Sequence, residues 1–381
     1  MTGTISVAGR LVLEDRVAVG RLAIEDGRIT DVALDSAGDG GAGVEGPFIA
    51  PGFVDVHVHG WGGHDAMGGR EALDGMARAL LRHGVTSFLP TAVTAPLDGL
   101  AAFAEGVRTW LPNAPADGAR PLGFNLEGPF LADARRGAHE AAHLRDPAAV
   151  PRAGLDGLVE GLRLVTVAPE LPGAMDLIRW LHDRGVTVSI GHSAAILEEA
   201  RASYAAGATS TTHLFNAMSG LDHRAPGLAL AALLDDAAYV ELIADGIHVH
   251  PAMWELITRL KPADRLLLVS DALAIAGTGE GRGRIGDLEV EVRDGRATLA
   301  GTETLAGSVI ALDDAVRNVV GSGMALPAAV AAASRNPLGL LGITDRGRLA
   351  PGQAADLVEL DEDLSVLRVM RGGTWVVDNS T

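Results

Sequence analysis

The stretch Pro51-Gly-Phe-Val-Asp-Val-His-Val-His-Gly60 is an apolar run that ends in two histidines. In an extended chain successive side chains point to opposite faces, so His57 and His59, two positions apart, point to the same face. Two imidazoles on one face can bind one metal ion, although such a pair also occurs on ordinary strands. The stretch therefore predicts a buried strand with a candidate metal site at its carboxyl end.

Seven further apolar runs follow, and alanine- and leucine-rich stretches of helical character separate them. This alternation is typical of parallel strands joined by helices. Eight strand–helix units over roughly 290 residues match a (β/α)₈ TIM barrel, which needs about 250 residues before insertions. The expected strands are Phe53–His59, Thr86–Pro90, Leu122–Glu127, Leu164–Ala168, Thr187–His192, Thr209–His213, Val240–His248 and Leu266–Asp271, and the expected helices include Glu71–His83, Pro96–Trp110, Gly173–Arg184, Ala195–Ala206 and Pro251–Lys261.

Two joints between a helix and the next strand have nearly the same sequence, Leu81-Arg-His-Gly-Val-Thr86 and Leu181-His-Asp-Arg-Gly-Val-Thr187. A glycine directly after a helix commonly adopts the left-handed conformation that ends the helix. We therefore expect Gly84 and Gly185 to end helices. His83 and His182 then have a structural explanation, because a cation near a helix C-terminus complements the helix dipole.

The two ends of the chain differ from the barrel region. Residues 1–50 read as short alternating strands, with a tight hairpin turn expected at Asp26-Gly27 and a glycine-rich loop from Gly38 to Gly46. The last thirty-odd residues return to this pattern. We expect residues 1–50 and 346–381 to form one small β-sandwich domain and residues 51–345 to form the barrel.

The composition limits which side chains can bind a metal and which partners the protein can have. The chain of 381 residues has no cysteine and a formal net charge of −18. His and carboxylate side chains are then the plausible metal ligands, and the negative field disfavours binding to nucleic acid or to acidic membranes. The sequence has neither a signal-peptide pattern at its start nor a long apolar span, so we expect a cytoplasmic protein.

Polar residues end almost every expected strand. These residues are His57, His59, Glu127, His192, His213, His248 and Asp271. Catalytic groups of TIM barrels lie at the carboxyl ends of the strands. One such histidine could be a hydrogen-bonded core residue, but five at four strand ends favour a metal centre. Asp271 is the expected general base and acid, because a carboxylate beside a metal can take a proton from water and pass it to a leaving nitrogen.

These motifs resemble the amidohydrolase superfamily and, within it, the N-acetylglucosamine-6-phosphate deacetylase family. The resemblance covers nearly the whole chain, and its most specific parts are Asn125-Leu-Glu-Gly-Pro-Phe130 and Thr212-His-Leu-Phe-Asn-Ala-Met218. It implies metal-dependent hydrolysis of the acetamide of N-acetyl-D-glucosamine 6-phosphate to D-glucosamine 6-phosphate and acetate. That reaction belongs to amino-sugar catabolism and recycling.

The resemblance also implies a role for individual residues. Glu127, His192 and His213 would hold the main metal ion, and His57 and His59 would hold a second ion that Glu127 could bridge. His139 would polarise the acetamide carbonyl and, like Asn216, Ala217, Arg224 and His248, would contact the substrate. Arg224 would reach the active site of a neighbouring subunit, which implies a homodimer.

Some alternatives stay open. One or two divalent ions per subunit are expected, with zinc favoured and iron, manganese or cobalt as alternatives. The only lysine, Lys261, precedes the last barrel strand instead of ending a strand, which disfavours amidohydrolases that bridge two metals through a carboxylated lysine. The rival functions are hydrolysis of N-acyl amino acids, deacetylation of N-acetylgalactosamine 6-phosphate, and sensing of a sugar phosphate without catalysis.

Overall fold

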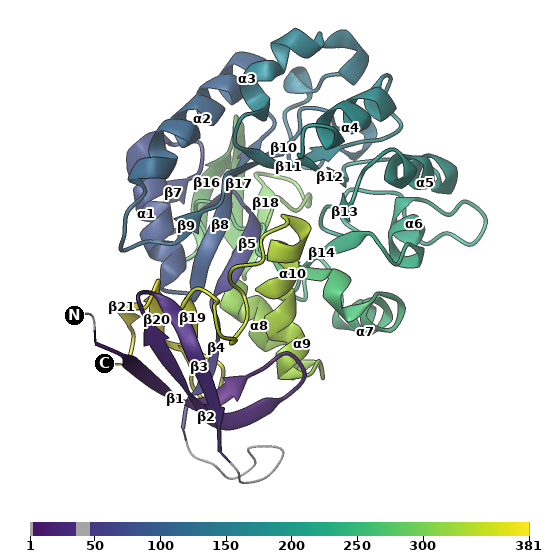
Figure 1. Ribbon diagram of the computed structural model, residues 1–381. Coiled ribbons are helices and arrows are strands. Elements are labelled where there is room, and N and C mark those ends of the chain that lie inside the picture. The colour runs from purple at the N-terminus through teal and green to yellow at the C-terminus, as the bar shows by residue number, and fades with distance from the viewer. Residues whose placement is uncertain (1–2, 36–45, 381) are drawn as a thin grey trace.

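The computed structural model describes residues 3–35 and 46–380, and its centre is a parallel β-barrel surrounded by helices (Figure 1). Neighbouring barrel strands are hydrogen-bonded in chain order, and a short strand, β9 (Arg120–Pro121), pairs beside β8. The eight strands are β5 (Phe53–Val58), β8 (Val85–Val93), β10 (Phe124–Glu127), β11 (Leu162–Val167), β12 (Thr187–Ile190), β13 (Ser210–Thr211), β14 (Tyr239–Ile243) and β15 (Leu266–Val269).

Backbone hydrogen bonds close the barrel just beyond the carboxyl ends of its first and last strands. The N–H of Asp271 donates to the carbonyl of His57, and the N–H of His59 donates to the carbonyl of Ala272, each at 2.9 Å. Apolar side chains such as Val54, Leu164 and Leu267 form a core cluster contributed by several barrel strands. The barrel predicted from the alternating runs is therefore confirmed.

Ten α-helices lie among the described residues, and the longer ones bury one apolar face. In α1 the buried residues Leu73, Met76, Ala77 and Leu80 recur at helical spacing. The helices are α1 (Gly69–Leu81), α2 (Leu97–Trp110), α3 (Asp156–Val159), α4 (Ala174–His182), α5 (Leu197–Ala205), α6 (Leu228–Leu234), α7 (Pro251–Leu260), α8 (Leu312–Gly321), α9 (Leu326–Ala332) and α10 (Arg335–Leu340). The five helices expected from the sequence are all present.

Both ends of the chain contribute to one seven-stranded sheet, in the order β21-β20-β19-β4-β1-β2-β3. Its strands are β1 (Ile5–Val12), β2 (Val17–Glu25), β3 (Arg28–Leu34), β4 (Phe48–Pro51), β19 (Leu357–Leu360), β20 (Val366–Arg371) and β21 (Thr374–Asp378). Side chains from both chain ends, such as Leu22 and Met370, share one core.

This sheet curves so that its two hairpins meet. The expected turn at Asp26-Gly27 is present, with φ of 48° and 76°. The carbonyl of Gly27 accepts from the N–H of Ala355, whose carbonyl in turn accepts from the N–H of Gly373.

The expected loop from Gly38 to Gly46 lies outside the described residues except for Gly46. We propose residues 50 and 346 as the inner boundaries of this small domain.

A three-stranded antiparallel sheet after β15 was not predicted. It consists of β16 (Gly281–Ile285), β17 (Leu288–Arg293) and β18 (Arg296–Leu299). Its apolar side packs on Val93 at the end of β8 and on Leu273 beyond β15, at the carboxyl end of the barrel. A two-stranded ribbon, β6 (Gly60–Trp61) and β7 (His64–Asp65), follows the first barrel strand.

Several expected strands end earlier than predicted. Strands β12 and β15 end at Ile190 and Val269, two residues before His192 and Asp271, and β14 and β13 also stop short. Strand β14 ends at Ile243, so the prediction that His248 ends the seventh strand was wrong. The segment Asp245-Gly-Ile-His248 instead forms a turn in which the Asp245 carboxylate accepts the N–H groups of Ile247 and His248. Strand β13 ends at Thr211, and His213 lies two residues beyond it. In both cases polar side chains and tight turns end the strand before the apolar pattern stops.

Candidate metal centre

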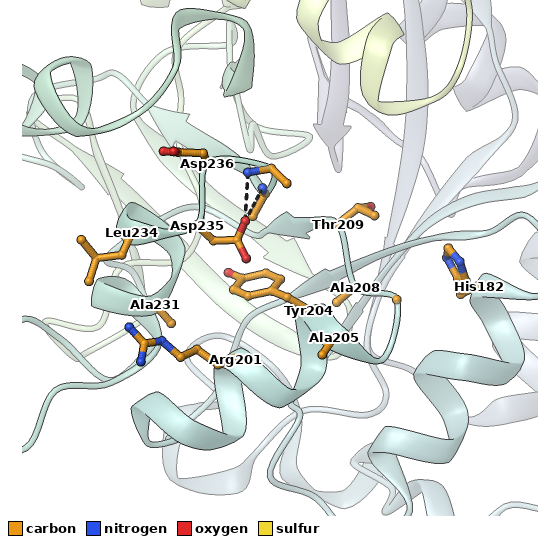
Figure 2. A pocket seen from close by; sticks show the side chains of 13 residues that line it. His182, Arg201, Tyr204, Ala205, Ala208, Thr209, Ala231, Leu234, Asp235 and Asp236 are labelled. Atoms are coloured by element: carbon orange, nitrogen blue, oxygen red, sulfur yellow. Dashed lines mark hydrogen bonds between the residues drawn. The ribbon is translucent and has the colours of Figure 1, made fainter.

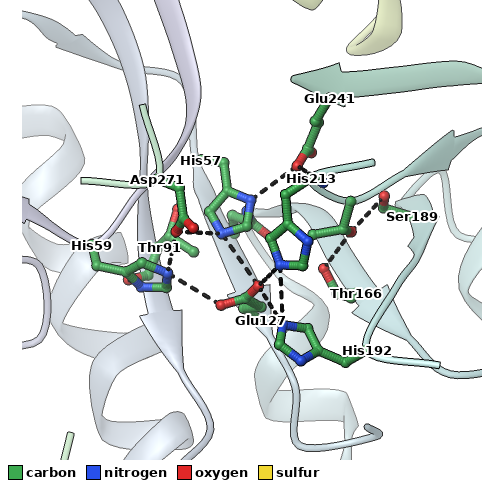
Figure 3. A network of polar contacts seen from close by, with 12 residues as sticks. His57, His59, Thr91, Glu127, Thr166, Ser189, His192, His213, Glu241 and Asp271 are labelled. Carbon is green, nitrogen blue, oxygen red and sulfur yellow. Dashed lines mark hydrogen bonds and ion pairs between the residues drawn. The ribbon is translucent and has the colours of Figure 1, made fainter. Parts of the chain in front are cut away.

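Glu127, the last residue of β10, lies at the centre of a buried cluster of histidines (Figure 3). Its Oε1 atom is 3.0 Å from Nε2 of His192 and 2.9 Å from Nε2 of His213. Its Oε2 atom is 3.2 Å from Nε2 of His59 and 3.3 Å from Nε2 of His139. One carboxylate thus faces histidines from four segments, as a residue that bridges two metal ions would.

Asp271 lies on the other side of the His57–His59 pair. Its Oδ1 atom is 3.5 Å from Nε2 of His57 and 3.3 Å from Nε2 of His59. Ligand atoms of His57, His59, Glu127 and Asp271 come within 4.8 Å of one another, and so do those of Glu127, His139 and His192. The structure therefore brings together the five predicted metal ligands, His139 and Asp271.

Hydrogen bonds on the far side of three rings orient them toward this cluster. Nδ1 of His57 donates to the carboxylate of Glu241 at 3.0 Å, Nδ1 of His59 faces the carbonyl of Thr91 at 3.2 Å, and Nδ1 of His192 faces that of Arg135 at 2.9 Å. When Nδ1 of a histidine donates a hydrogen bond, Nε2 keeps the lone pair that binds a metal. All three Nε2 atoms face the cluster.

The pKa shifts in the cluster indicate that it favours additional positive charge. Burial raises the pKa of the Glu127 carboxyl, but the surrounding histidines outweigh it and hold this pKa well below its usual range. Burial likewise lowers the pKa of His59, but the carboxylates of Asp271 and Glu127 outweigh it and raise this pKa to about 9. Buried carboxylates of this kind stabilise positive charge among the rings.

A divalent cation fits this centre. Nε2 of His57 and Nε2 of His59 are buried and have no hydrogen-bond partner among the described residues. Both atoms point at carboxylate oxygens at distances beyond 3 Å, which leaves room for an ion between them to take the place of protons. Imidazole nitrogens with carboxylate oxygens are a donor set that suits zinc, iron, manganese and cobalt.

His139 differs from the other histidines in its charge. Burial and the neighbouring His192 lower the pKa of His139 to about 4, so this ring is neutral near pH 7. Its Nδ1 accepts from the backbone N–H of Thr94 at 3.4 Å and lies 2.8 Å from the Thr94 hydroxyl. This arrangement assigns the proton to Nε2, which faces Glu127 and can donate a hydrogen bond inside the site.

Three residues of the buried cluster adopt backbone conformations that are rare for residues with a side chain. His192, His213 and Asp271 have φ of 47°, 28° and 49°. Each lies two residues beyond the end of its barrel strand. Such conformations cost about 1–3 kcal/mol and are maintained only where surrounding contacts determine them. Their concentration at this cluster supports a functional role for it.

The cluster opens into a cavity of about 490 Å³. Asn216, Ala217 and His248, the residues expected to contact the substrate, line it. His248 is held by Asp245, whose Oδ2 atom is 2.7 Å from Nδ1 of the ring. Arg224 does not line this cavity; it is exposed on the loop before α6, where its backbone N–H donates to Asp222. Within this chain the expected contact residues therefore gather without Arg224.

A larger cavity, of about 810 Å³, lies between α5 and α6 (Figure 2). Its lining includes Tyr204, Asp235 and Leu234 and none of the clustered histidines. Oδ1 of Asp235 accepts the N–H groups of Ala237 and Ala238 in the turn that follows α6. The smaller cavity at Glu127 is the candidate active site because, of the two cavities, only this one contains the cluster of candidate metal ligands.

Comparison with known proteins agrees with this assignment. The model of the amidohydrolase family matches residues 48–376. The chain belongs to the amidohydrolase family. It is 40% identical over 347 residues to an N-acetylglucosamine-6-phosphate deacetylase of Danio rerio, covering 87% of this chain and 85% of that one. It is 39% identical over 328 residues to an N-acetylgalactosamine-6-phosphate deacetylase of Escherichia coli O157:H7, covering 84% and 85%.

Solved structures show the same likeness. The crystal structure of N-acetylglucosamine-6-phosphate deacetylase from Thermotoga maritima matches with a TM-score of 0.91 and 33% sequence identity, covering 98% of this chain and 100% of that one. The barrel of this amidohydrolase and the additional sheet formed by the chain ends are thus features of a known fold.

Some residues of this amidohydrolase site were missed from the sequence. Ile285, Glu303 and Leu305, from the segment around the unpredicted sheet, line the active-site cavity. The alternation in residues 281–293 and the Asp294-Gly295 turn were signals for that sheet. Glu241, which binds His57, was also missed. Its signal is a carboxylate in the middle of the otherwise apolar run Val240-Glu-Leu-Ile243.

Proposed function

We propose that this protein hydrolyses the acetamide of N-acetyl-D-glucosamine 6-phosphate to D-glucosamine 6-phosphate and acetate, in amino-sugar catabolism and recycling. The observation that carries the proposal is the buried arrangement of histidines around Glu127, with Asp271 beside it, at the mouth of the barrel. The names of the relatives supply the substrate class.

The metal ligands we propose are Glu127, His192 and His213 for one ion, with His57 and His59 for a second and Glu127 between them. A divalent ion bound there would activate water at neutral pH and polarise the acetamide carbonyl. We propose zinc as the ion, since imidazole and carboxylate ligands suit it. The cluster needs no thiolate, in keeping with a chain that lacks cysteine.

Asp271 and His139 are the catalytic residues in this proposal. Asp271 accepts a proton from the attacking water and returns it to the sugar nitrogen as the amide bond breaks. Burial tends to raise the pKa of Asp271, but His57 and His59 lower it, so the carboxylate is ionised and ready to act as a base. Neutral His139 donates through Nε2 to the carbonyl oxygen as negative charge develops on it.

Recognition of the sugar phosphate falls to residues at the cavity wall. Asn216, Ala217 and His248 line the cavity and would contact the sugar and its phosphate. Arg224, exposed in this subunit, would bind the phosphate of a neighbouring active site in a homodimer, where its guanidinium can form a bidentate contact. We propose a cytoplasmic location; within the described residues no helix is long and apolar enough to cross a membrane.

The experiment is measurement of acetate release from N-acetylglucosamine 6-phosphate by metal-free and metal-loaded protein, with metal content determined in parallel. We expect release only by the loaded protein. Absence of release at full metal content would refute the proposal. Hydrolysis of N-acyl amino acids at an equal rate would favour that rival, and tight substrate binding without turnover or metal would favour a sensor.

Deacetylation of N-acetylgalactosamine 6-phosphate is a second candidate. A relative with that name matches this chain at 39% identity, close to the 40% of the relative that acts on the gluco epimer. The two substrates differ only at one hydroxyl of the sugar ring. A comparison of kcat/KM for the two epimers decides between them, and we expect the larger value for the gluco epimer.

A further inference from the structure

A buried glutamate of strand β14 lies directly behind the metal centre (Figure 3). Glu241 is fully buried. Its Oε2 atom accepts from Nδ1 of His57 at 3.0 Å and from the backbone N–H of His213 at 3.1 Å. Its other oxygen, Oε1, has no hydrogen-bond partner among the described residues. The carboxylate therefore depends on these two contacts.

The surroundings of Glu241 are apolar. Tyr239 and Ile243, which point the same way along β14, belong to the apolar cluster in the barrel. A carboxylate in such a place is costly unless a positive group compensates it. Among the described residues His57 is the only ion-pair partner of Glu241. The compensating charge must therefore come through the imidazole of His57.

The geometry at His57 shows how that charge is supplied. Nδ1 is used by Glu241, so Nε2 is the atom that faces the centre, 3.5 Å from Oε1 of Glu127 and 3.5 Å from Oδ1 of Asp271. A divalent ion on Nε2 would polarise the ring and strengthen the hydrogen bond from Nδ1 to Glu241. Carboxylates that bind a ligating histidine in this way raise its basicity and fix its tautomer.

We infer that Glu241 is a positioning residue that holds His57 as a metal ligand and connects the two halves of the metal centre. One oxygen orients His57 of the His57–His59 pair, and the same oxygen fixes the backbone of His213, which belongs to the other half. The strained φ of His213 is held in part by this contact. The inference rests on the metal centre of the proposed function and adds the residue that orders it.

The test compares two variants by metal binding without substrate. Glu241→Gln keeps an oxygen that can accept from the N–H of His213 but removes the negative charge at His57. Glu359→Gln is the matched control, because Glu359 is also a buried strand glutamate but pairs with Arg368 in the small sheet. Metal-free proteins are titrated with Zn²⁺ against a competing chelator, and bound zinc per chain is measured at each step.

We expect wild type to bind two ions, one more weakly than the other, and Glu359→Gln to bind each of them as tightly as wild type does. Glu241→Gln should bind the weaker ion about 10–100-fold less tightly, the usual loss when such a partner of a ligand is removed. Unchanged affinity in Glu241→Gln, or a wild type that binds one ion only, would overturn the inference. A wild type that binds two ions but releases no acetate would refute the proposed substrate and leave the inference standing.

A double-mutant cycle guards against a merely structural effect. If Glu241 acts through His57, then Glu241→Gln should cause no further loss of zinc affinity in a His57→Ala background. Additive losses would mean that Glu241 acts elsewhere and would overturn the inference. Thermal denaturation of the metal-free proteins, followed by circular dichroism, shows whether each variant is folded before titration.

Discussion

Asp271 is the residue on which the proposed chemistry depends most. It follows β15, and its carboxylate faces His57 and His59 without an arginine or lysine partner among the described residues. Asp271→Asn keeps the shape and removes the base. We expect kcat to fall by about 10²–10⁴-fold, the usual contribution of a general base, while zinc content stays near that of wild type because the histidines and Glu127 remain. Unchanged turnover at normal zinc content would contradict the role.

Lys261 is the only lysine of the chain, and its titration should make the stability of the fold depend on pH. Its buried Nζ donates to the carbonyls of Ala232, at 3.0 Å, and of Asp235, near the end of α6. Burial lowers the pKa of Lys261 to about 8, below its unfolded value near 10.4. Between these values the unfolded chain binds more protons than the folded one, so stability rises with pH.

Lys261→Met removes this titration. We expect the melting temperature of wild type, measured relative to that of Lys261→Met, to increase between pH 8 and pH 10. No other lysine contributes in either state, and the tyrosines are common to both proteins. A difference that stays constant or shrinks over this range would show that folding does not lower the pKa of Lys261.

At the scale of elements, the sequence was informative where one local rule decides the structure. Apolar runs and helical periodicity predicted all eight barrel strands, and glycines at Gly84 and Gly185 predicted two helix ends. The three strained residues, His192, His213 and Asp271, could be predicted as strand-end ligands but not in their conformations. Those conformations depend on contacts between distant segments, such as that of Glu241 with the backbone of His213.

The errors have the same cause. An apolar run does not show where the hydrogen-bonded ladder stops, so His248 was placed at the end of a strand although Asp245 turns the chain first. Nor does a single carboxylate in a strand show which ring it will bind, so Glu241 was missed. The sheet from β16 to β18 was overlooked because a barrel of eight strands was already complete without it.

The two helix-ending glycines offer a matched pair. Gly84 and Gly185 have nearly the same φ, 76° and 73°. A Cβ on Gly84 would lie 2.9 Å from Val358 and 3.0 Å from Phe53, whereas a Cβ on Gly185 would meet nothing within 4 Å. Alanine at Gly185 should therefore cost only the left-handed backbone penalty, about 1–2 kcal/mol.

Alanine at Gly84 should cost more, because it also pushes apart the barrel strand of Phe53 and the small sheet that contains Val358. Thermal denaturation of the two variants measures this, and we expect the larger drop in melting temperature for Gly84→Ala. Equal drops would show that the contact between barrel and small sheet adjusts without cost.

At the scale of the whole molecule, a net charge of −18 has to coexist with an anionic substrate. Cations near the cavity can attract the substrate despite this net charge. Salt screens the charges that lie more than about 8–10 Å away. Arg135 lines the cavity and has no ion pair among the described residues, whereas its neighbour Arg136 pairs with Asp133. Arg224, exposed and away from this cavity, would add its charge only through a second subunit.

That arrangement predicts complementation between two variants that are each nearly inactive at low substrate concentration. Arg224→Ala should raise KM for the phosphorylated substrate, and Asp271→Asn should lower kcat by about 10²–10⁴-fold. In a mixed dimer of the two, the subunit that keeps Asp271 receives an intact Arg224 from its partner, so one of its two sites works. Because random pairing makes half of the dimers mixed, co-expressed variants should regain about a quarter of the wild-type sites at low substrate concentration. Activity no greater than that of the separate variants would mean that Arg224 acts within its own subunit or plays no part in binding.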